Sequence, residues 1–366
     1  MDADFAIVGG GVVGLSVAWG LLRAGQSVVV VDGADDALRA SRGNFGLIWV
    51  QGKGLNAPHY ARWSRRSAAL WGAFAQELED NTGLDLALRQ EGGLDLHFSD
   101  GSLADCAARY AALRAELGGD YPFEVLTGAA LMREEPGIGP KVAGAVLHPE
   151  DGHANPLMLL RALSEDMRRL GGRLETGRMV SQLLPPGEGF ALGCADGTVF
   201  HAGRVVLAAG LGAAVLGPQL GFAAPVTPER GQVLITEKLP PLIRRPSLIA
   251  RQVGEGAVQI GATNERAGLD DRSTRKGMAQ LAAEAVAAYP ALAQAQLVRS
   301  WGALRVMSPD GLPIYQESEA VPGAFLITCH SGITLAAANA RLMPNWILGR
   351  DGAPDLEVFG EARFAV

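Results

Sequence analysis

Lysine is scarce in this chain of 366 residues: Lys53, Lys141, Lys238 and Lys276 are the only four among 32 basic side chains. The formal net charge is -7, and an acidic surface with few lysines argues against nucleic acid or an anionic membrane as the partner. Charged residues make up only 19% and apolar residues 48%. This composition and length predict a globular, soluble protein of two domains whose core needs no metal or disulfide.

Cysteine is also rare, and Cys106, Cys194 and Cys329 lie far apart with no Cys-x-x-Cys pair. No two of the six histidines have the spacing of metal ligands, so we expect a reducing compartment and no metal site. Segments 5–22 and 205–226 lack charged side chains, but both are interrupted by glycines and contain a strand-turn-helix pattern, so we expect no transmembrane segment. The start, Met-Asp-Ala-Asp, lacks the basic region of a secretory signal. The expected location is the cytoplasm, with peripheral attachment to a membrane as the alternative.

Glycine, in contrast, is abundant, and its most informative group is Gly9, Gly11 and Gly14. These residues form G-x-G-x-x-G after an apolar strand and before a helical run, and Asp32 ends the next strand. Glycines at this turn let the backbone approach a pyrophosphate, whose charge sits at the helix N-terminus, and the acid accepts hydrogen bonds from ribose hydroxyls. The acid disfavours a 2'-phosphate and hence NADP. A glycine-rich turn without a nucleotide is the alternative.

A second match to the pattern, Gly52-Lys-Gly-Leu-Asn-Ala57, has its acid, Glu77, inside an amphipathic helix. It therefore predicts no second dinucleotide site. One nucleotide fold alone argues against a flavoprotein that NAD(P)H reduces internally.

Hydrophobic periodicity predicts the remaining elements. We expect helices at 58–81, 103–117, 156–170, 272–288 and 333–348, and strands at 92–98, 143–147, 205–209, 231–236, 257–261 and 324–328. The predicted class is α/β: a Rossmann-type dinucleotide-binding domain (1–85, 140–215 and 300–366) interleaved with an α+β substrate domain on a mixed or antiparallel sheet (86–139 and 216–299).

The first 32 residues do not distinguish NAD from FAD, but four later segments resemble the FAD-dependent D-amino-acid oxidase superfamily. The likeness covers nearly the whole chain and is closest to the branch of glycine oxidase, sarcosine oxidase, and the subunits of hydrogen cyanide synthase and opine oxidase. The first segment, 40–48, is similar to the family's loop under the pyrophosphate and beside the isoalloxazine. The second comprises Val180, at the place of an adenine contact, and the strand 205–209 that ends at Gly210.

The third segment, Trp301-Gly-Ala-Leu-Arg305-Val-Met-Ser-Pro-Asp-Gly-Leu-Pro313, is similar to a family stretch near the flavin. The resemblance implies that Arg305 binds the substrate carboxylate, which a guanidinium fork can hold by two parallel bonds. Ala303 stands where some members attach the flavin through cysteine, so the FAD is expected to be non-covalent. A structurally paired arginine is the alternative for Arg305.

The fourth segment runs from Phe325 to Thr334 and is similar to the family's G-H-x-x-G loop, with Cys329 in place of the usual glycine. The helix that starts near Gly332 would direct its N-terminal amides at the flavin. His330 is a candidate base, but an imidazole bonded to the loop backbone is favoured, since hydride transfer from a neutral amine needs no protein base. The full set of predicted cofactor contacts is Gly9, Gly11, Val12, Val13, Gly14, Asp32, Ser41, Arg42, Asn44, Phe45, Gly46, Leu47, Val180, Ala209, Gly210, Arg305, His330, Ser331, Gly332, Ile333 and Thr334.

The resemblance implies oxidation of an amino acid or secondary amine to an imine: glycine, sarcosine, a D-amino acid, hydroxyproline or an opine. The electron acceptor is oxygen, or a quinone or protein, with a dehydrogenase favoured, and a heteromeric partner subunit could complete the electron path. Arg251 and Glu265 either face substrate or form a solvated pair, and Lys53 contacts either the pyrophosphate or water. Two other functions remain open, an NAD-dependent dehydrogenase and a non-catalytic flavin-binding subunit.

Overall fold

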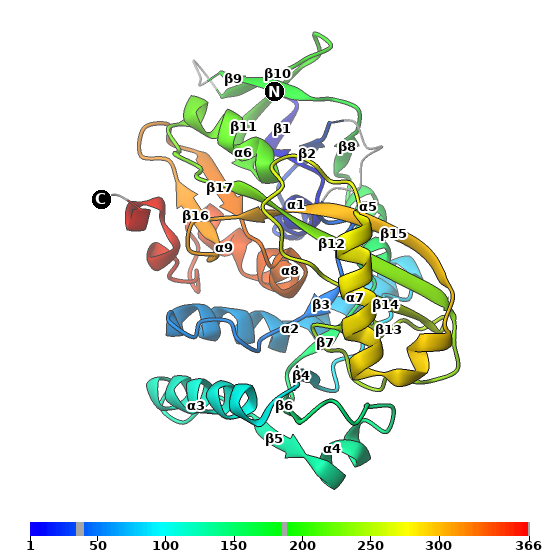
Figure 1. Ribbon diagram of the computed structural model, residues 1–366. Helices are drawn as coiled ribbons and strands as arrows, with labels where there is room; N and C mark the ends of the chain where they lie inside the picture. Colours follow the sequence, from blue (N-terminus) through cyan, green and yellow to red (C-terminus); the bar gives the residue numbers. More distant parts are fainter. Residues whose placement is uncertain (34–39, 185–188, 365–366) are drawn as a thin grey trace.

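A computed structural model describes residues 1–33, 40–184 and 189–364. Its main sheet has the strand order β16-β17-β11-β1-β2-β8, and a hairpin of β9 and β10 continues from β11 (Figure 1). The neighbours from β17 to β8 are parallel, whereas β16 is antiparallel. These strands are β1 (Ala3–Val8), β2 (Val28–Val31), β8 (Arg173–Glu175), β9 (Val180–Leu184), β10 (Phe190–Cys194), β11 (Val199–Leu207), β16 (Ile314–Glu317) and β17 (Ala324–Thr328).

Helices cover one face of the main sheet, and residues of β9, β10 and the segment 213–226 form a second buried cluster with the side chains of the other face. Burial of both faces explains why the central strands are continuously apolar. α1 (Val12–Arg23) contacts α5 (Pro156–Arg169) and α8 (Gly332–Arg341), and α2 (Pro58–Thr82) packs against α8 and α5 (Figure 1). The buried ring of Trp19 lies 5.6 Å from that of Phe74. Aromatic pairs of this kind contribute on the order of 1 kcal/mol beyond the area that they bury.

The last predicted helix, 333–348, is in fact two. α8 ends at Arg341 and α9 (Met343–Leu348) follows Leu342, which caps both. Pro344 lies in the first turn of α9, where its missing N–H is tolerated, but the same residue could not continue α8. The sequence prediction was therefore wrong here, because apolar periodicity runs on across the break.

A second sheet lies beside the first, with the order β13-β14-β12-β15 and antiparallel neighbours throughout. It consists of β12 (Thr227–Lys238), β13 (Ala250–Gln252), β14 (Ala257–Gly261) and β15 (Leu297–Met307), covered by α7 (Arg275–Ala288). The Thr274 side chain caps α7 by accepting from the amide of Gly277, so the helix begins three residues later than the pattern predicted. The predicted α/β class with an antiparallel second sheet is confirmed.

A third, small sheet has the order β4-β6-β5 and carries α3 on its surface (Figure 1). Its elements are β4 (Gly93–His97), α3 (Asp100–Glu116), β5 (Glu124–Thr127), α4 (Gly128–Glu134) and β6 (Gly144–His148). The short strands β3 (Leu47–Ile48) and β7 (Gly152–His153) pair with each other. The remaining helices are α6 (Ala213–Leu216) and the 3-10 turns η1 (Gly210–Gly212), η2 (Gly217–Leu220), η3 (Pro290–Gln294), η4 (Glu357–Phe359) and η5 (Glu361–Phe364). Within the described ranges no helix has both the length and the apolar character that crossing a bilayer requires.

Candidate active site

The predicted glycine turn connects β1 to α1 and leaves no room for side chains. A Cβ on Gly14 would lie 1.9 Å from the carbonyl oxygen of Gly9, and Gly9 itself has φ +112° with the Ala208 oxygen 2.4 Å from its own Cβ position. The N-cap residue of α1 is Gly11, which has no side chain that could bond to the free amides at the start of the helix. The turn therefore presents bare backbone at a helix N-terminus, the arrangement that binds phosphate.

The loop after β2 closes over this turn. The amide of Val12 donates to Ser41 Oγ at 3.0 Å, and a Cβ on Gly11 would lie 3.1 Å from the same oxygen. Asp32 follows β2 as predicted, with its carboxylate 3.1 Å from the Cβ position of Gly10. An acid at the end of this strand is where a ribose would be bound.

These parts border one cavity of about 670 Å³, a volume typical of ligand sites. It extends from Asp32 past the glycine turn to the start of α8. The predicted contacts that line it are Gly9, Gly11, Val12, Val13, Asp32, Ser41, Arg42, Asn44, Val180, Ala209, Gly210, His330 and Gly332. Residues outside the predicted set of cofactor contacts also line it, among them Met179, Leu211, Val215, Leu304, Val306 and Cys329. Their only signal in the sequence was adjacency to predicted residues.

Other predicted contacts lie outside this lining. Gly14 is buried beneath the turn, and Thr334 Oγ1 accepts from the amide of Trp49 at 3.0 Å, so Thr334 fastens the 40–48 loop to α8. Gly46 donates its amide to Asn44 Oδ1 at 2.7 Å. The others outside the lining are Phe45, Leu47, Arg305, Ser331 and Ile333.

Arg305 lies on β15 between Leu304 and Val306, which face the cavity, so its side chain projects from the opposite face of the strand. Its Nη1 donates to the Thr263 carbonyl at 2.8 Å and to Glu229 Oε1 at 3.2 Å. The guanidinium lies over Gly231, where a Cβ would be 2.8 Å from Nη2. Burial lowers the pKa of Arg305 from its usual value. The guanidinium remains charged and the side chain is 22% exposed, so part of it is accessible to a ligand.

His330 stands at the end of the cavity next to Ser331, which is the centre of a polar cluster. Lys53 Nζ donates to Ser331 Oγ at 2.5 Å, and the hydroxyl of Tyr60 donates to it at 3.0 Å. Lys53 therefore bonds to the cap of α8, a contact that the sequence did not predict. Burial, with the nearby charges of Lys53 and Arg305, lowers the pKa of His330 to about 3. The imidazole is neutral at physiological pH, and Arg305 acts on it electrostatically.

Arg251 and Glu265 do not form a pair. Glu265 binds Arg230 instead, at 2.8 Å, which helps to lower its pKa to about 2. Arg251 is only 3% exposed; its Nη1 lies 2.9 Å from His153 Nδ1, and its Nε has no partner within the described part of the chain. Arg251 faces the loop, with its guanidinium 5.8 Å from the ring of Phe45.

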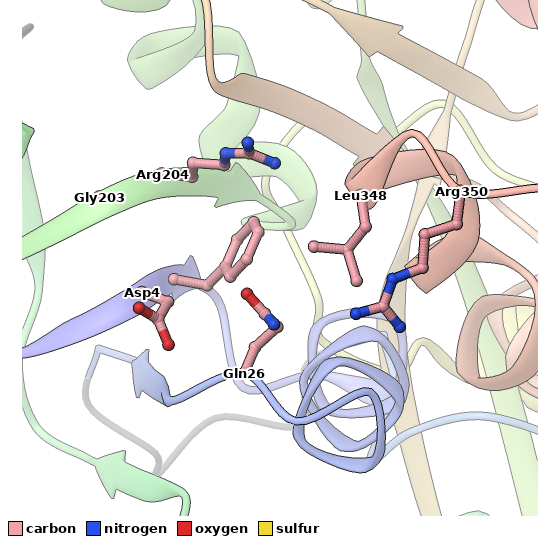
Figure 2. A pocket seen from close by; sticks show the side chains of 7 residues that line it. Asp4, Gln26, Gly203, Arg204, Leu348 and Arg350 are labelled. Carbon is pink, nitrogen blue, oxygen red and sulfur yellow. The ribbon is translucent and has the colours of Figure 1, made fainter.

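A second hollow of about 370 Å³ lies away from this site, around Asp4, Gln26, Arg204, Leu348 and Arg350 (Figure 2). Its arginines satisfy carbonyls at helix ends: Arg204 donates to the Ile347 oxygen and Arg350 to the Ala24 oxygen, both at 3.2 Å. Cations at helix C-termini are stabilising, so this hollow has a structural explanation.

Comparison with known proteins places this geometry in context. The family model described as FAD dependent oxidoreductase matches residues 4–346. A subunit of the opine oxidase of Rhizobium meliloti is 42% identical over 99% of this chain and 98% of its own length. Glycine oxidase of Geobacillus kaustophilus is 28% identical over 98% of this chain and 97% of its own length. The crystal structure of glycine oxidase from Geobacillus kaustophilus superposes with a TM-score of 0.91, covering 98% of both chains at 27% identity.

Proposed function

The chain belongs to the FAD-dependent oxidoreductase family, and on that premise we propose that it oxidises the C–N bond of a carboxylate-bearing secondary amine of the opine kind to an imine. The predicted kinship and the predicted FAD are both confirmed by the family match. The observation that carries the proposal is the partly exposed, charged side chain of Arg305, which lies close enough to His330, a residue of the cavity lining, to help lower the pKa of that residue.

The residues present fit FAD. Gly9 and Gly14 permit a tight turn in which a Cβ at either position would clash with a backbone oxygen, and Asp32 stands at the ribose position. α1 and α8 both begin beside the cavity without a side-chain cap from their own N-cap residues. Ala303 at the position of the family's flavin-linking cysteine supports non-covalent binding. These residues would hold the pyrophosphate and ribose by the contacts that their backbone and carboxylate groups can make.

When bound, FAD supplies the acceptor for the two electrons and the hydrogen that leave the substrate carbon. Arg305 would bind the substrate carboxylate and so fix the Cα–H direction, and correct positioning alone can lower a barrier by several kcal/mol. The amides at the start of α8 favour negative charge at that end of the cavity. The amine nitrogen loses its proton to water, and the imine product is hydrolysed by water to a carbonyl compound and a free amine.

The opine substrate class and a heteromeric assembly are supported by the opine oxidase relative, whose name describes it as one subunit of its enzyme. We propose a partner subunit that passes electrons onward to a quinone or protein acceptor, with oxygen as the alternative. The proposed location is the cytoplasm or the inner face of a membrane.

The visible spectrum of the purified protein tests the proposal, followed by anaerobic addition of glycine, sarcosine, D-amino acids, proline derivatives and opines. We expect a flavin band near 450 nm that bleaches with N-substituted amino acids, and reoxidation in air or only with a quinone identifies the acceptor. Bleaching must weaken in Arg305→Ala at equal substrate concentration. A protein that binds FAD but whose flavin is bleached by no amine would instead be a non-catalytic subunit. A colourless protein that FAD cannot reconstitute would favour the alternative of an NAD-dependent dehydrogenase.

A further inference from the structure

The third sheet and its helix α3 bring together three side chains with metal-binding atoms: Asp95 and His97 from β4 and Cys106 from α3. Their ligand atoms all lie within 4.8 Å of one another. Cys106 Sγ lies 3.7 Å and His97 Nε2 lies 3.9 Å from Asp95 Oδ2. We propose that Asp95, His97 and Cys106 bind a divalent zinc-type cation, with water as the fourth ligand.

The hydrogen bonds around His97 direct a lone pair at this point. Ser102 Oγ donates to the Ser99 carbonyl at 3.0 Å, so its hydrogen is used there. His97 Nδ1 lies 3.2 Å from the same Oγ, and the tautomer that fits this arrangement carries its hydrogen on Nδ1. The proton of a neutral His97 is then on Nδ1, and Nε2, which is buried and has no hydrogen-bond partner among the described residues, turns a lone pair toward the Asp95 carboxylate. Two electron-rich atoms facing each other favour a cation between them.

The donor set matches zinc more closely than calcium or magnesium, which prefer oxygen ligands alone. Usual zinc bond lengths with tetrahedral angles place sulfur and oxygen ligands about 3.6 Å apart and nitrogen and oxygen ligands about 3.4 Å apart. The observed separations of 3.7 and 3.9 Å need only a small contraction. Tyr110, whose hydroxyl donates to Asp95 Oδ2 at 3.3 Å, and Ser102 would hold the carboxylate and imidazole in place, as outer partners commonly do at metal sites.

The thiol is protonated in the absence of a cation. Burial and the charge of Asp95 raise the pKa of Cys106 to about 11, against smaller opposite effects from Tyr110 and Arg109. Cation binding must displace this proton, so the affinity rises with pH. The cation would link β4 to α3, away from the cofactor cavity, and would act as a structural clip independent of the oxidase chemistry (Figure 1).

The experiment uses the FAD-loaded protein, stripped with a chelator and then equilibrated with zinc sulfate. We expect one zinc per chain by elemental analysis, a zinc–sulfur distance of about 2.3 Å by X-ray absorption, and a higher melting temperature. Cys106→Ser and His97→Gln should each weaken zinc binding by at least about 100-fold, whereas Cys194→Ser, a change at another buried thiol, should not. His97→Gln replaces a partly exposed side chain and covers the case in which Cys106→Ser does not fold.

Three results would overturn the site: folded wild-type protein that retains no zinc at micromolar concentrations, bound zinc without a sulfur neighbour, or zinc binding that persists when His97→Gln and Cys106→Ser are combined in one protein. A melting temperature that stays unchanged when zinc is added to the stripped protein would also overturn it.

Discussion

Arg305 and Glu229 face each other across the paired strands β15 and β12, with Nη1 3.2 Å from Oε1. The second bond of the same nitrogen goes to the Thr263 carbonyl. The guanidinium is therefore partly neutralised before any ligand arrives. A substrate carboxylate must bind the remaining edge and compete with the charge of Glu229.

Glu229→Gln should accordingly tighten the binding of carboxylate ligands. The amide oxygen can keep the bond to Arg305 while the competing negative charge is lost, so we expect the Kd of a carboxylate inhibitor to fall by about 3- to 10-fold. Titration of the flavin absorbance measures it. Glu284→Gln, on the exposed face of α7, is the matched control and should change nothing. Unchanged or weaker inhibitor binding in Glu229→Gln would show that the carboxylate does not bind at Arg305.

His330→Asn should leave the rate of substrate oxidation within about tenfold of the wild type. An imidazole with a pKa of about 3 is too weak a base to contribute the 100-fold or more expected of general base catalysis near neutral pH. The profile of kcat/KM between pH 5 and 9 should keep its shape. A loss of 100-fold or more together with a missing limb of that profile would make His330 the base, and the exposed His201→Asn controls for unspecific effects.

Gly14→Ala should prevent FAD binding, because its Cβ would lie 1.9 Å from the backbone oxygen of Gly9 and neither group can move without deforming the turn. We expect a loss of at least about 3 kcal/mol in the free energy of unfolding of any protein that folds. Gly72→Ala is the control: it lies in α2 with no atom within 4 Å of its Cβ position, and should be neutral or stabilising by up to about 1 kcal/mol. Stable Gly14→Ala protein that binds a full equivalent of FAD would contradict the geometry of the turn.

Much of this fold could be predicted from local signals. The strand predicted at 324–328 is β17, and the helix predicted at 58–81 is α2 with one more residue. The glycine turn and Asp32 were readable because a short turn between a strand and a helix constrains neighbouring residues directly.

The side-chain pairs of the site could not be predicted, because they join distant parts of the chain. Lys53 meets Ser331 across 278 residues, and Arg251 meets His153 across 98. The candidate metal cluster was missed for another reason: Cys106 lies nine residues after His97, which is not a usual ligand spacing, and only the packing of α3 on the third sheet brings the two together. Whether Arg305 points into the cavity depends on which face of β15 each residue occupies, and the strand there is too mixed in polarity to reveal it.

Two buried arginines test how much a carboxylate partner contributes to the free energy of unfolding. Arg251 is 3% exposed without a carboxylate bonded to it in the described ranges, whereas Arg230, at 6%, bonds Glu265 and Asp270. Arg230→Met leaves Glu265 without its cation, whereas Asp270 keeps its ion pair with Arg272, and we expect a loss of about 3 kcal/mol. Arg251→Met removes an unpaired buried charge and should leave the free energy of unfolding unchanged or higher. Urea unfolding at a fixed excess of FAD compares them; equal losses would mean that Arg251 has an anionic partner in the folded protein.

The stability of the protein should fall steeply on acidification. Burial lowers the pKa of His148, His153 and His330 to about 3, so below pH 6.5 the unfolded chain binds three protons that the folded chain does not. Their contribution to stability is complete above pH 6.5 and is lost as the pH falls toward 3. Burial raises the pKa of Asp151 to about 7, which acts in the opposite direction: the folded chain keeps a proton that the unfolded chain releases above pH 3.8.

Near pH 5 the unfolded chain binds about two protons more at these four groups than the folded chain does. The free energy of unfolding therefore rises with pH by about 2.7 kcal/mol per pH unit. Urea unfolding followed by tryptophan fluorescence at constant FAD, between pH 4.5 and 6, measures it. His148→Gln should lower the slope by about one proton, because His148 is fully buried, while His201→Gln, at an exposed position, should not change it. A slope that His148→Gln leaves intact would mean that this imidazole is protonated in the folded protein despite its burial.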